Sequence, residues 1–465
     1  MFLKIRLILC IQFISCACYS GDKLIDKIEK VRIQNNISAA LVIIVDKNKI
    51  VKQAHLGTIS WENKHQFSQE NMFRIGSISK TFAGMLALKM HNAGLINLTQ
   101  TLSHYVKNNP IKNDFPTEIT LRQLLEHSAG LSDLSKAEWD FNEADRISLQ
   151  QSLALKLGNH KSRWQPGLHS SYSNVGAAYL GLALEKAGGQ SYEALMDDFV
   201  FEPLGMKSST LFLNTSVKNR LITGYNTDGK TPINYWHNIY RPFAAMNTDA
   251  KDLVIFLQML LNGGNHNQEQ FLRKSDISRI QNPETTLSAK SGLTYGYGLG
   301  IYSWQANGHT FYGHGGDADG YLTRFGYNTE SGLAYFIMIN AFQHSALKQI
   351  KNLVEHNITK HLAKPIYPLR LKLSHELLTK YIGKYYKVTS RFNRLSQNNN
   401  SDFEIINQEG NLLIHFKNGR KQNIYAVNNS HFRYEEESVA TMAFIEHQEH
   451  MYFQGDMGNF IKRQK

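Results

Sequence analysis

Cysteine is scarce in this chain of 465 residues, and its placement excludes a disulfide framework. The three cysteines, Cys10, Cys16 and Cys18, all lie within the first 18 residues. The body that follows therefore cannot form an internal disulfide, and packing must supply its stability. Long apolar runs are scarce as well, because beyond the N-terminus no run is long enough to cross a bilayer as a helix.

Signals for nucleic acid and for metals are also missing. The net charge of +12 and the pI of about 9.3 favour anionic surfaces such as cell-wall polymers or lipid headgroups. There is no dense Lys/Arg run and no nucleic-acid-binding motif, so we expect no nucleic-acid partner. No His/Cys/Asp cluster has metal-ligand spacing, and the Asp317–Gly320 segment, which loosely resembles a calcium loop, lacks the acidic residues that should follow. We expect neither a metal nor a cofactor.

The first 20 residues have the pattern of an export signal. Basic residues precede a short apolar run, and small residues follow as far as Ser20. We therefore expect an exported protein, either periplasmic or secreted. Two fates of the signal are open: plain cleavage near Ala17 or Ser20, or lipoprotein cleavage that leaves a membrane-anchoring lipid on Cys16.

The order of hydrophobic patterns predicts an α+β fold for a first domain over residues 21–364. Runs of β-branched, apolar or aromatic residues bounded by turn signals predict strands at 39–45, 50–54, 297–302, 310–314, 321–327 and 333–340. Helical periodicity predicts helices at 22–34, 77–94, 119–126, 174–187, 249–261 and 344–361. This order indicates one antiparallel sheet built from both ends of the domain, flanked by helices, with a helical insertion between.

A second, β-rich domain is predicted after a linker at 365–372. Residues 373–465 contain short apolar runs at 381–387, 403–406, 412–416, 424–427, 442–447 and 451–454. Asn418-Gly419 is a strong hairpin signal, and the polar stretch 391–401 is expected to be an exposed loop. A small barrel or sandwich fits this pattern.

The stretch from Phe73 to Met90 combines a buried helix with a reactive pair. The helix is apolar on nearly all sides, which is typical of a helix inside a large domain. Ser77 and Lys80 lie three residues apart and therefore on one face. Burial and the helix dipole disfavour the ammonium form of this lysine, and a neutral amine can take the proton of an attacking serine. Ser-x-x-Lys also occurs at Ser20 and Ser345, and a serine can simply cap a helix, so the pair needs support from elsewhere.

Two further polar clusters interrupt apolar surroundings. Tyr172-Ser173-Asn174 precedes a predicted helix, and His314-Gly315-Gly316 ends a predicted strand. Alone, each has an ordinary structural interpretation: a core tyrosine, a helix N-cap and a strand-edge histidine. The oxyanion loop of lipases is a competing interpretation of His-Gly-Gly, but the Gly-x-Ser-x-Gly motif that it needs does not follow.

Together and in this order, the three clusters resemble the motifs of the serine β-lactamase-like family. That family includes class C β-lactamases, penicillin-binding D,D-carboxypeptidases, D-amino-acid peptidases and esterases. The phrases FRIGSISK, QPGLHSSYSN and YGYGLG agree with it, and the resemblance runs from about residue 37 to residue 339. The trailing β domain more loosely resembles a barrel-like extension found on some members.

The resemblance implies catalytic roles for three residues. Ser77 would be the acylated nucleophile and Lys80 its proton acceptor. Tyr172 would sit near the leaving group, and the charge of Lys80 would favour its phenolate, which could then relay protons.

The same resemblance implies a substrate-binding set. Asn174 would hold Lys80 and donate a hydrogen bond to the substrate. Gly315 and Gly316 would let a substrate lie against the strand edge. The oxyanion hole would be formed by the backbone N–H groups of Ser77 and Asp317.

His314 departs from the pattern, because many β-lactamases and penicillin-binding proteins have lysine there. Histidine is largely neutral at pH 7, so it attracts a substrate carboxylate less strongly. This difference, and the lack of a glutamate like the class A deacylation base, favours a peptidase or esterase over a β-lactamase. The expected partner is a small-molecule or peptide acyl substrate: a cell-wall stem peptide, another D-amino-acid peptide, an ester or a β-lactam. A catalytically silent cell-wall peptide-binding module is the alternative, and the oligomeric state is not predicted.

Overall fold

The computed structural model describes residues 22–107, 111–143, 147–391 and 402–463. The predicted export signal, with Cys16, and all of the predicted loop 391–401 except Arg391 lie outside these ranges. Within them, no helix has both the length and the apolar character needed to cross a membrane.

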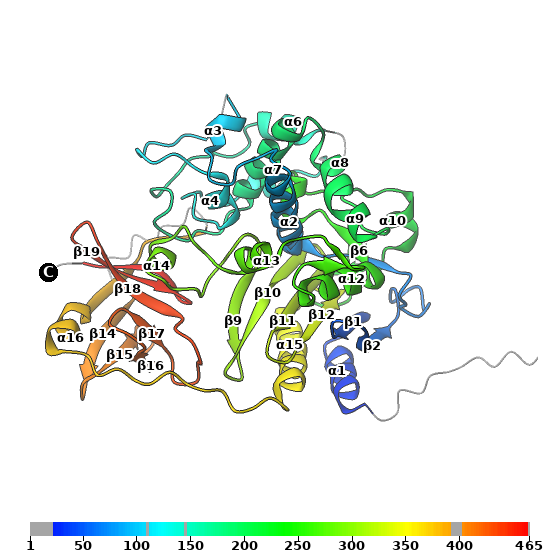
Figure 1. Cartoon of the computed structure of the whole chain (residues 1–465). Coiled ribbons are helices and arrows are strands. Elements are labelled where there is room, and N and C mark those ends of the chain that lie inside the picture. The colour runs from blue at the N-terminus through cyan, green and yellow to red at the C-terminus, as the bar shows by residue number, and fades with distance from the viewer. Residues whose placement is uncertain (1–21, 108–110, 144–146, 392–401, 464–465) are drawn as a thin grey trace, which may run out of the picture.

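A six-stranded antiparallel sheet forms the centre of the first domain (Figure 1). Its strand order is β2-β1-β12-β11-β10-β9, so the two ends of the domain meet in one sheet, as predicted. The strands are β1 (Ala39–Val45), β2 (Ile50–Gly57), β9 (Tyr302–Ala306), β10 (His309–Ala318), β11 (Tyr321–Asn328) and β12 (Leu333–Ile339).

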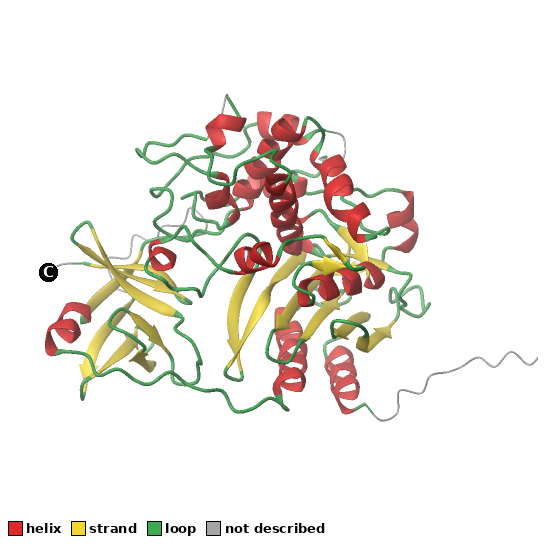
Figure 2. Ribbon diagram, viewed as in Figure 1, coloured by secondary structure: helices red, strands yellow, loops and turns green. Residues whose placement is uncertain are grey.

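Helices cover both faces of this sheet (Figure 2). On β1 every residue is buried, and alternate side chains enter different cores. Leu41 and Ile43 pack toward the helical middle of the chain, whereas Val42 and Ile44 pack toward α1 (Lys23–Gln34) and α15 (His344–Thr359). This double burial explains why β1 is a continuous apolar run rather than an alternating one.

The chain between β2 and β9 supplies the helical layer. Its longest helices are α2 (Ser79–Asn92), α7 (Asn174–Gly188) and α12 (Ala250–Leu261), which agree with predicted helices within a few residues. The shorter helices are α3 (Leu102–Tyr105), α4 (Leu121–Leu125), α5 (Lys136–Asp140), α6 (Leu149–Ala154), α8 (Tyr192–Met196), α9 (Glu202–Leu204), α10 (Thr215–Arg220), α11 (Arg241–Ala244), α13 (Lys274–Gln281) and α14 (Leu287–Lys290). Small strand pairs join β3 (Met72–Arg74) to β6 (Asn247–Asp249), β4 (Gly224–Tyr225) to β5 (Pro232–Ile233) and β7 (Asn265–His266) to β8 (Glu269–Gln270).

Two local predictions in this domain were wrong. Ser77 does not open the long helix: it lies in a 3₁₀ turn, η1 (Gly76–Ile78), and α2 begins at Ser79. The segment 297–302 is not a strand, and β9 begins only at its last residue, Tyr302. Gly296, just before the segment, and Gly300, within it, have φ of 148° and 113°, which interrupts extended pairing.

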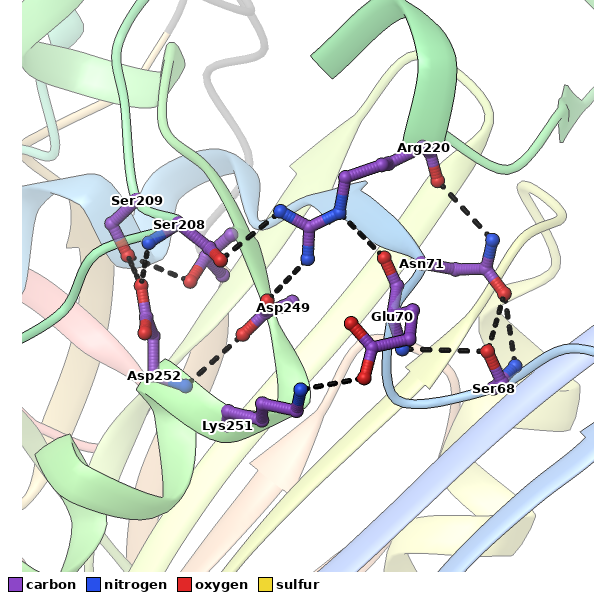
Figure 3. A network of polar contacts seen from close by, with 10 residues as sticks. Ser68, Glu70, Asn71, Ser208, Ser209, Arg220, Asp249, Lys251 and Asp252 are labelled. Carbon is purple, nitrogen blue, oxygen red and sulfur yellow. Dashed lines mark hydrogen bonds and ion pairs between the residues drawn. The ribbon is translucent and has the colours of Figure 1, made fainter. Parts of the chain in front are cut away.

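The strand that leads to Ser77 is anchored by a polar network (Figure 3). Arg220, at the end of α10, donates to the Glu70 carbonyl at 2.6 Å and to the Asp249 carboxylate at 2.6 Å. Asp249 also caps α12 by accepting from the Asp252 backbone N–H at 3.1 Å. Lys251 pairs with the Glu70 side chain at 2.6 Å, outside the buried part of the network. These bonds tie the segment before β3 to β6 and α12.

The C-terminal domain is a closed eight-stranded barrel with its own core, which agrees with the predicted barrel. It occupies the orange-to-red end of the chain in Figure 1. Its strands are β13 (Gly383–Lys387), β14 (Phe403–Gln408), β15 (Asn411–Phe416), β16 (Lys421–Ala426), β17 (His431–Arg433), β18 (Met442–His447), β19 (His450–Gly455) and β20 (Gly458–Lys462).

Three elements of the barrel domain were missed by the sequence patterns: β17, β20 and α16 (His375–Tyr381). Because α16 ends at Tyr381, β13 begins two residues later than the predicted strand. The domain limits at 21–364 and 373–465 stay predictions.

Candidate functional site

Ser77 lies in a tight turn that neighbouring elements hold in place. Ser79 donates to the Gly76 carbonyl at 2.7 Å and accepts from the Met246 N–H at 3.2 Å. The N-cap residue of α2 is Ile78, so Ser77 is not the helix cap. Ser77 is partly exposed among buried neighbours, and its hydroxyl is therefore accessible from the adjoining cleft.

Lys80 lies within reach of that hydroxyl, as the spacing predicts. Its Nζ is 3.2 Å from Ser77 Oγ and donates to the Phe243 carbonyl at 2.9 Å. The side chain is buried, and burial lowers the pKa of its amine well below the usual value. Asp133 opposes this lowering and Arg391 adds to it. A neutral amine at this distance can accept the Ser77 proton.

Tyr172 adjoins the same pair but does not have the predicted charge state. Lys80 Nζ is 4.9 Å from the centre of its ring, and Ser77 is close enough to the phenol to lower its pKa. Burial raises the pKa of the phenol above its usual value, and it outweighs the effect of Ser77 and the charge of Arg391. The prediction of a favoured phenolate was wrong, because burial disfavours the charged form of the phenol more than its neighbours favour it.

Asn174 is close to the pair, but its partner is not the predicted one. Its backbone N–H donates to Asp133 Oδ1 at 2.8 Å, and its side-chain amide donates to Asp133 Oδ2 at 3.2 Å. Within the described ranges, no hydrogen bond joins Asn174 to Lys80. The Asn174 Oδ1 atom is buried and has no partner among these residues, so it is a vacant acceptor beside the cleft.

The carboxylate of Asp133 organises one wall of the site. It is fully buried, and besides Asn174 it accepts from Arg391 Nε at 2.6 Å. Arg391 follows β13 of the barrel, and its guanidinium carbon lies 4.8 Å from the centre of the Tyr172 ring. The barrel therefore contributes a cation to a site that otherwise belongs to the first domain.

His314 faces the same cleft from β10. Its Nε2 is 2.8 Å from the Tyr297 hydroxyl and its Nδ1 is 2.5 Å from the Gly315 carbonyl. The carbonyl fixes the proton on Nδ1, so Nε2 accepts from the tyrosine. Burial, with a smaller effect of Lys80, lowers the pKa of His314 to about 3. The imidazole is therefore neutral at physiological pH, as expected from its residue type.

The glycines of β10 bring its backbone against the Ser77 turn. A Cβ on Gly316 would lie 1.8 Å from the Ile75 carbonyl oxygen, and one on Gly76 would lie 2.7 Å from the Asp317 nitrogen. Gly76 also has φ of 53°, which few other residues tolerate. The backbones of Ser77 and Asp317 are thus neighbours, which is the arrangement that the predicted oxyanion hole needs.

The edge of β10 past Gly313 is available to a ligand. β9 pairs with β10 only as far as Gly313, and no described strand covers that edge from His314 to Ala318. A cleft of about 410 Å³ opens there, and its lining includes Ser77, Tyr172, Asn174, His314, Gly315 and Asp317. Of the predicted site residues, only Lys80 and Gly316 lie behind this lining.

A second cavity, of about 370 Å³, adjoins this cleft where the barrel meets the first domain. The two share Tyr172, Tyr302 and Arg391 as lining residues. Barrel residues Lys387 and Asn459 form part of its far wall. A substrate longer than a single residue could therefore extend from Ser77 along the barrel.

Among the residues of the site that sequence reasoning missed are Asp133, Tyr297, Arg324 and Arg391. Arg324 crosses from β11 to Asp317, 3.0 Å away, beside Gly315. Tyr297 lay in the segment that was misread as a strand. Asp133 and Arg391 are 258 residues apart, and no local pattern marks such a contact.

Comparison with known proteins places the chain among proteins of one family. The Beta-lactamase family model matches residues 22–358. Protein flp of Staphylococcus aureus (strain MW2) is 28% identical over 238 residues, which are 49% of this chain and 46% of that relative. The chain therefore aligns with less than half the length of that curated relative.

Solved structures share the fold at low identity. The octameric penicillin-binding protein homologue from Pyrococcus abyssi has a TM-score of 0.62 and 19% identity, over 95% of this chain and 99% of that one. The beta-lactamase/D-alanine carboxypeptidase from Yersinia pestis has a TM-score of 0.59 and 18% identity, over 72% of this chain and 97% of that one. Because this family model spans most of the sequence, the chain belongs to the beta-lactamase family.

Proposed function

We propose that the protein is a serine acyl hydrolase that works through an acyl-enzyme on Ser77. The observation that carries this proposal is the buried Lys80 amine, 3.2 Å from Ser77 Oγ and held there by the Phe243 carbonyl. Burial lowers the pKa of this amine well below its usual value, which favours the neutral form that can accept a proton, and the Ser77 hydroxyl is within reach.

In the acylation step, Lys80 takes the Ser77 proton as Ser77 Oγ attacks the substrate carbonyl carbon. The backbone N–H groups of Ser77 and Asp317 would hold the oxyanion, a contribution of about 2.7–4 kcal/mol per donor in comparable sites. Tyr172 is a neutral phenol, so it can pass its proton to the leaving group while it receives one from the Lys80 ammonium. The bond between the acyl carbon and the leaving group then breaks.

Deacylation follows the same proton path in reverse. A water molecule attacks the acyl carbon, and its proton reaches the neutral Lys80 amine either directly or through Tyr172, which gives its own proton to Lys80 as it receives the one from water. Ser77 Oγ leaves and takes back a proton, which restores the free enzyme. The roles of Lys80 and Tyr172 thus alternate between the two steps, as the reversal of one path requires.

A peptidase or esterase activity is favoured over a β-lactamase activity. His314 is neutral, whereas the lysine of many relatives at this position carries a charge. The cleft lining combines charged side chains, Asp319 and Arg324, with aromatic rings such as those of Trp139 and Phe243. Such a mixed lining suits a peptide, which presents polar backbone groups and apolar side chains together. A peptide containing D-amino acids, such as a cell-wall stem peptide, is the substrate class that we favour.

A hydrolysis panel tests the proposal. It contains a D-alanyl-D-alanine stem peptide, a D-amino-acid amide, a short ester and a β-lactam, each with wild type and Ser77→Ala. We expect turnover of a peptide or ester that disappears in Ser77→Ala. No turnover and no covalent labelling of wild type would instead favour a silent binding module, and rapid hydrolysis of the β-lactam alone would favour a β-lactamase.

A further inference from the structure

Arg391 reaches the catalytic centre from a different domain. It follows β13, and residues 389–391 are hydrogen-bonded to the first domain at two positions. Thr389 donates to the Ser170 carbonyl at 3.2 Å, and the Arg391 carbonyl accepts from the Asp133 N–H at 3.0 Å. Asn459 of β20 adds a 2.6 Å bond to the same Ser170 carbonyl. These bonds hold the barrel against the first domain and so fix the position of Arg391 beside the catalytic centre.

The partner that Arg391 meets is a buried carboxylate. Asp133 has no exposed side-chain surface, whereas the Arg391 side chain is 45% exposed. The Nε–Oδ2 distance of 2.6 Å is that of a charge-assisted hydrogen bond. A buried carboxylate without its cation is strongly unfavourable, so this pair is more than a surface contact.

We propose that Arg391 is a positioning residue of the catalytic centre, supplied by the barrel, which fixes Asp133 and balances its charge beside Lys80. Arg391 can affect the acylation step in two ways, through contacts that position other residues and through its charge. Asp133 holds both the backbone and the side-chain amide of Asn174, and the guanidinium covers one face of Tyr172. The proposal rests on the proposed function, because it concerns the protonation of Lys80 during acylation.

The effect of the Arg391 charge on the pKa of Lys80 is the easier of the two to measure. Asp133 raises the pKa of Lys80 and Arg391 lowers it, so the two effects oppose each other at one amine. Without Arg391, the uncompensated carboxylate would favour the ammonium form, and Lys80 would be a poorer base near neutral pH. The titratable side chains that face the amine are Asp133, Tyr172, His127, His314 and Arg391.

The other neighbours do not supply a compensating charge. Burial lowers the pKa of His127 well below its usual value and that of His314 to about 3, so both rings are neutral. Burial raises the pKa of the Tyr172 phenol, which is neutral as well. Asp133 and Arg391 are therefore the charged pair that sets the electrostatic environment of Lys80.

The test is the pH dependence of Ser77 labelling by a fluorophosphonate in the full chain. The variants are R391Q, R391K and the double variant D133N/R391Q. Lys384→Gln is the matched control, because Lys384 is an exposed cation on β13 of the same barrel. The melting temperature of each variant is recorded, and labelling is measured below the lowest of them.

For R391Q we expect the midpoint of the acid limb to move up by about one pH unit, with labelling about tenfold slower below the midpoint. R391K keeps the charge and should shift the midpoint less. D133N/R391Q removes both charges and should return the midpoint to the wild-type value, which a purely structural role would not do. Lys384→Gln should match wild type.

Three outcomes would overturn this inference. The R391Q profile could superimpose on that of wild type, or the midpoint of D133N/R391Q could stay as far displaced as that of R391Q. If R391Q does not fold, R391K and the double variant decide the question, and a midpoint far from wild type in both overturns the inference. Absence of labelling in wild type would overturn the proposed function itself, so the two failures are distinguishable.

Discussion

The contact between Gly316 and Ile75 offers a quantitative test of how the site is assembled. In Gly316→Ala the new Cβ would lie 1.8 Å from the Ile75 carbonyl oxygen and 2.4 Å from Thr323 Oγ1. To bring the first contact to 3.4 Å, where ordinary contacts begin, the two backbones must separate by about 1.6 Å. Both partners are backbone or buried, so neither can simply rotate away.

This separation acts directly on the reacting groups. Ile75 lies two residues before Ser77, and Gly316 lies immediately before Asp317. Moving them apart changes the distance between the Ser77 hydroxyl and the Asp317 N–H. Because a misplacement of about 1 Å can cost on the order of 100-fold in rate, we expect Gly316→Ala to slow Ser77 acylation by at least about 100-fold. Overpacking should also lower the free energy of unfolding by about 1–3 kcal/mol.

Gly315→Ala is the matched control. Its Cβ would meet the end of the Arg324 side chain, 2.6 Å from Cζ, and that guanidinium is partly exposed and can move. We expect a far smaller loss of rate. The assay is fluorophosphonate labelling and ester hydrolysis below the melting temperature of both variants. Near-normal labelling of Gly316→Ala, or an equal loss in both variants, would refute the assembly described here.

Three further predictions concern Lys80 and the network of Figure 3. Lys80→Ala should slow acylation by about 10²–10⁴-fold, since it removes the proton acceptor, and near-normal labelling would mean that the proton goes elsewhere. Lys80→Met should raise the melting temperature at neutral pH: the pKa of Lys80 is lowered in the folded state, so the unfolded chain binds more protons and stability rises with pH up to about 10.5. That gain should shrink as the pH approaches 10.5, and an unchanged or lower melting temperature at neutral pH would contradict it. Arg220→Gln leaves the buried Asp249 carboxylate without its cation and should lower the free energy of unfolding, measured in urea, by about 3 kcal/mol. Lys251→Gln, which breaks the exposed Glu70 pair, should cost under about 1 kcal/mol, and equal costs would be inconsistent with the network.

The sequence predicts those helices and strands whose pattern is carried by residues adjacent in the chain. The apolar run of β1, the long helices α2 and α7, and the strands from β10 to β12 follow from periodicity over adjacent residues. Helices and strands whose hydrophobic pattern is short or interrupted by glycine were missed or misplaced. Gly296 and Gly300 turn the chain within an aromatic stretch that reads as a strand, and its Tyr297 instead supports His314.

The site was predicted less completely because its electrostatics are set by burial and by distant residues. The spacing of Ser77 and Lys80 predicts their contact, since both lie on one short segment. The charge state of Tyr172 was predicted from Lys80 as a cation, but burial disfavours charge on both side chains. The Asp133–Arg391 pair joins two domains, and only the folded chain reveals it.

The most direct measurement of the central claim is intact-protein mass spectrometry of the full chain after incubation with a fluorophosphonate, followed by peptide mapping. We expect a single adduct on the peptide that contains Ser77, no adduct in Ser77→Ala, and strongly slowed formation in Lys80→Ala. An adduct on another residue, or labelling that persists in Ser77→Ala, would contradict the assignment of Ser77 as the nucleophile.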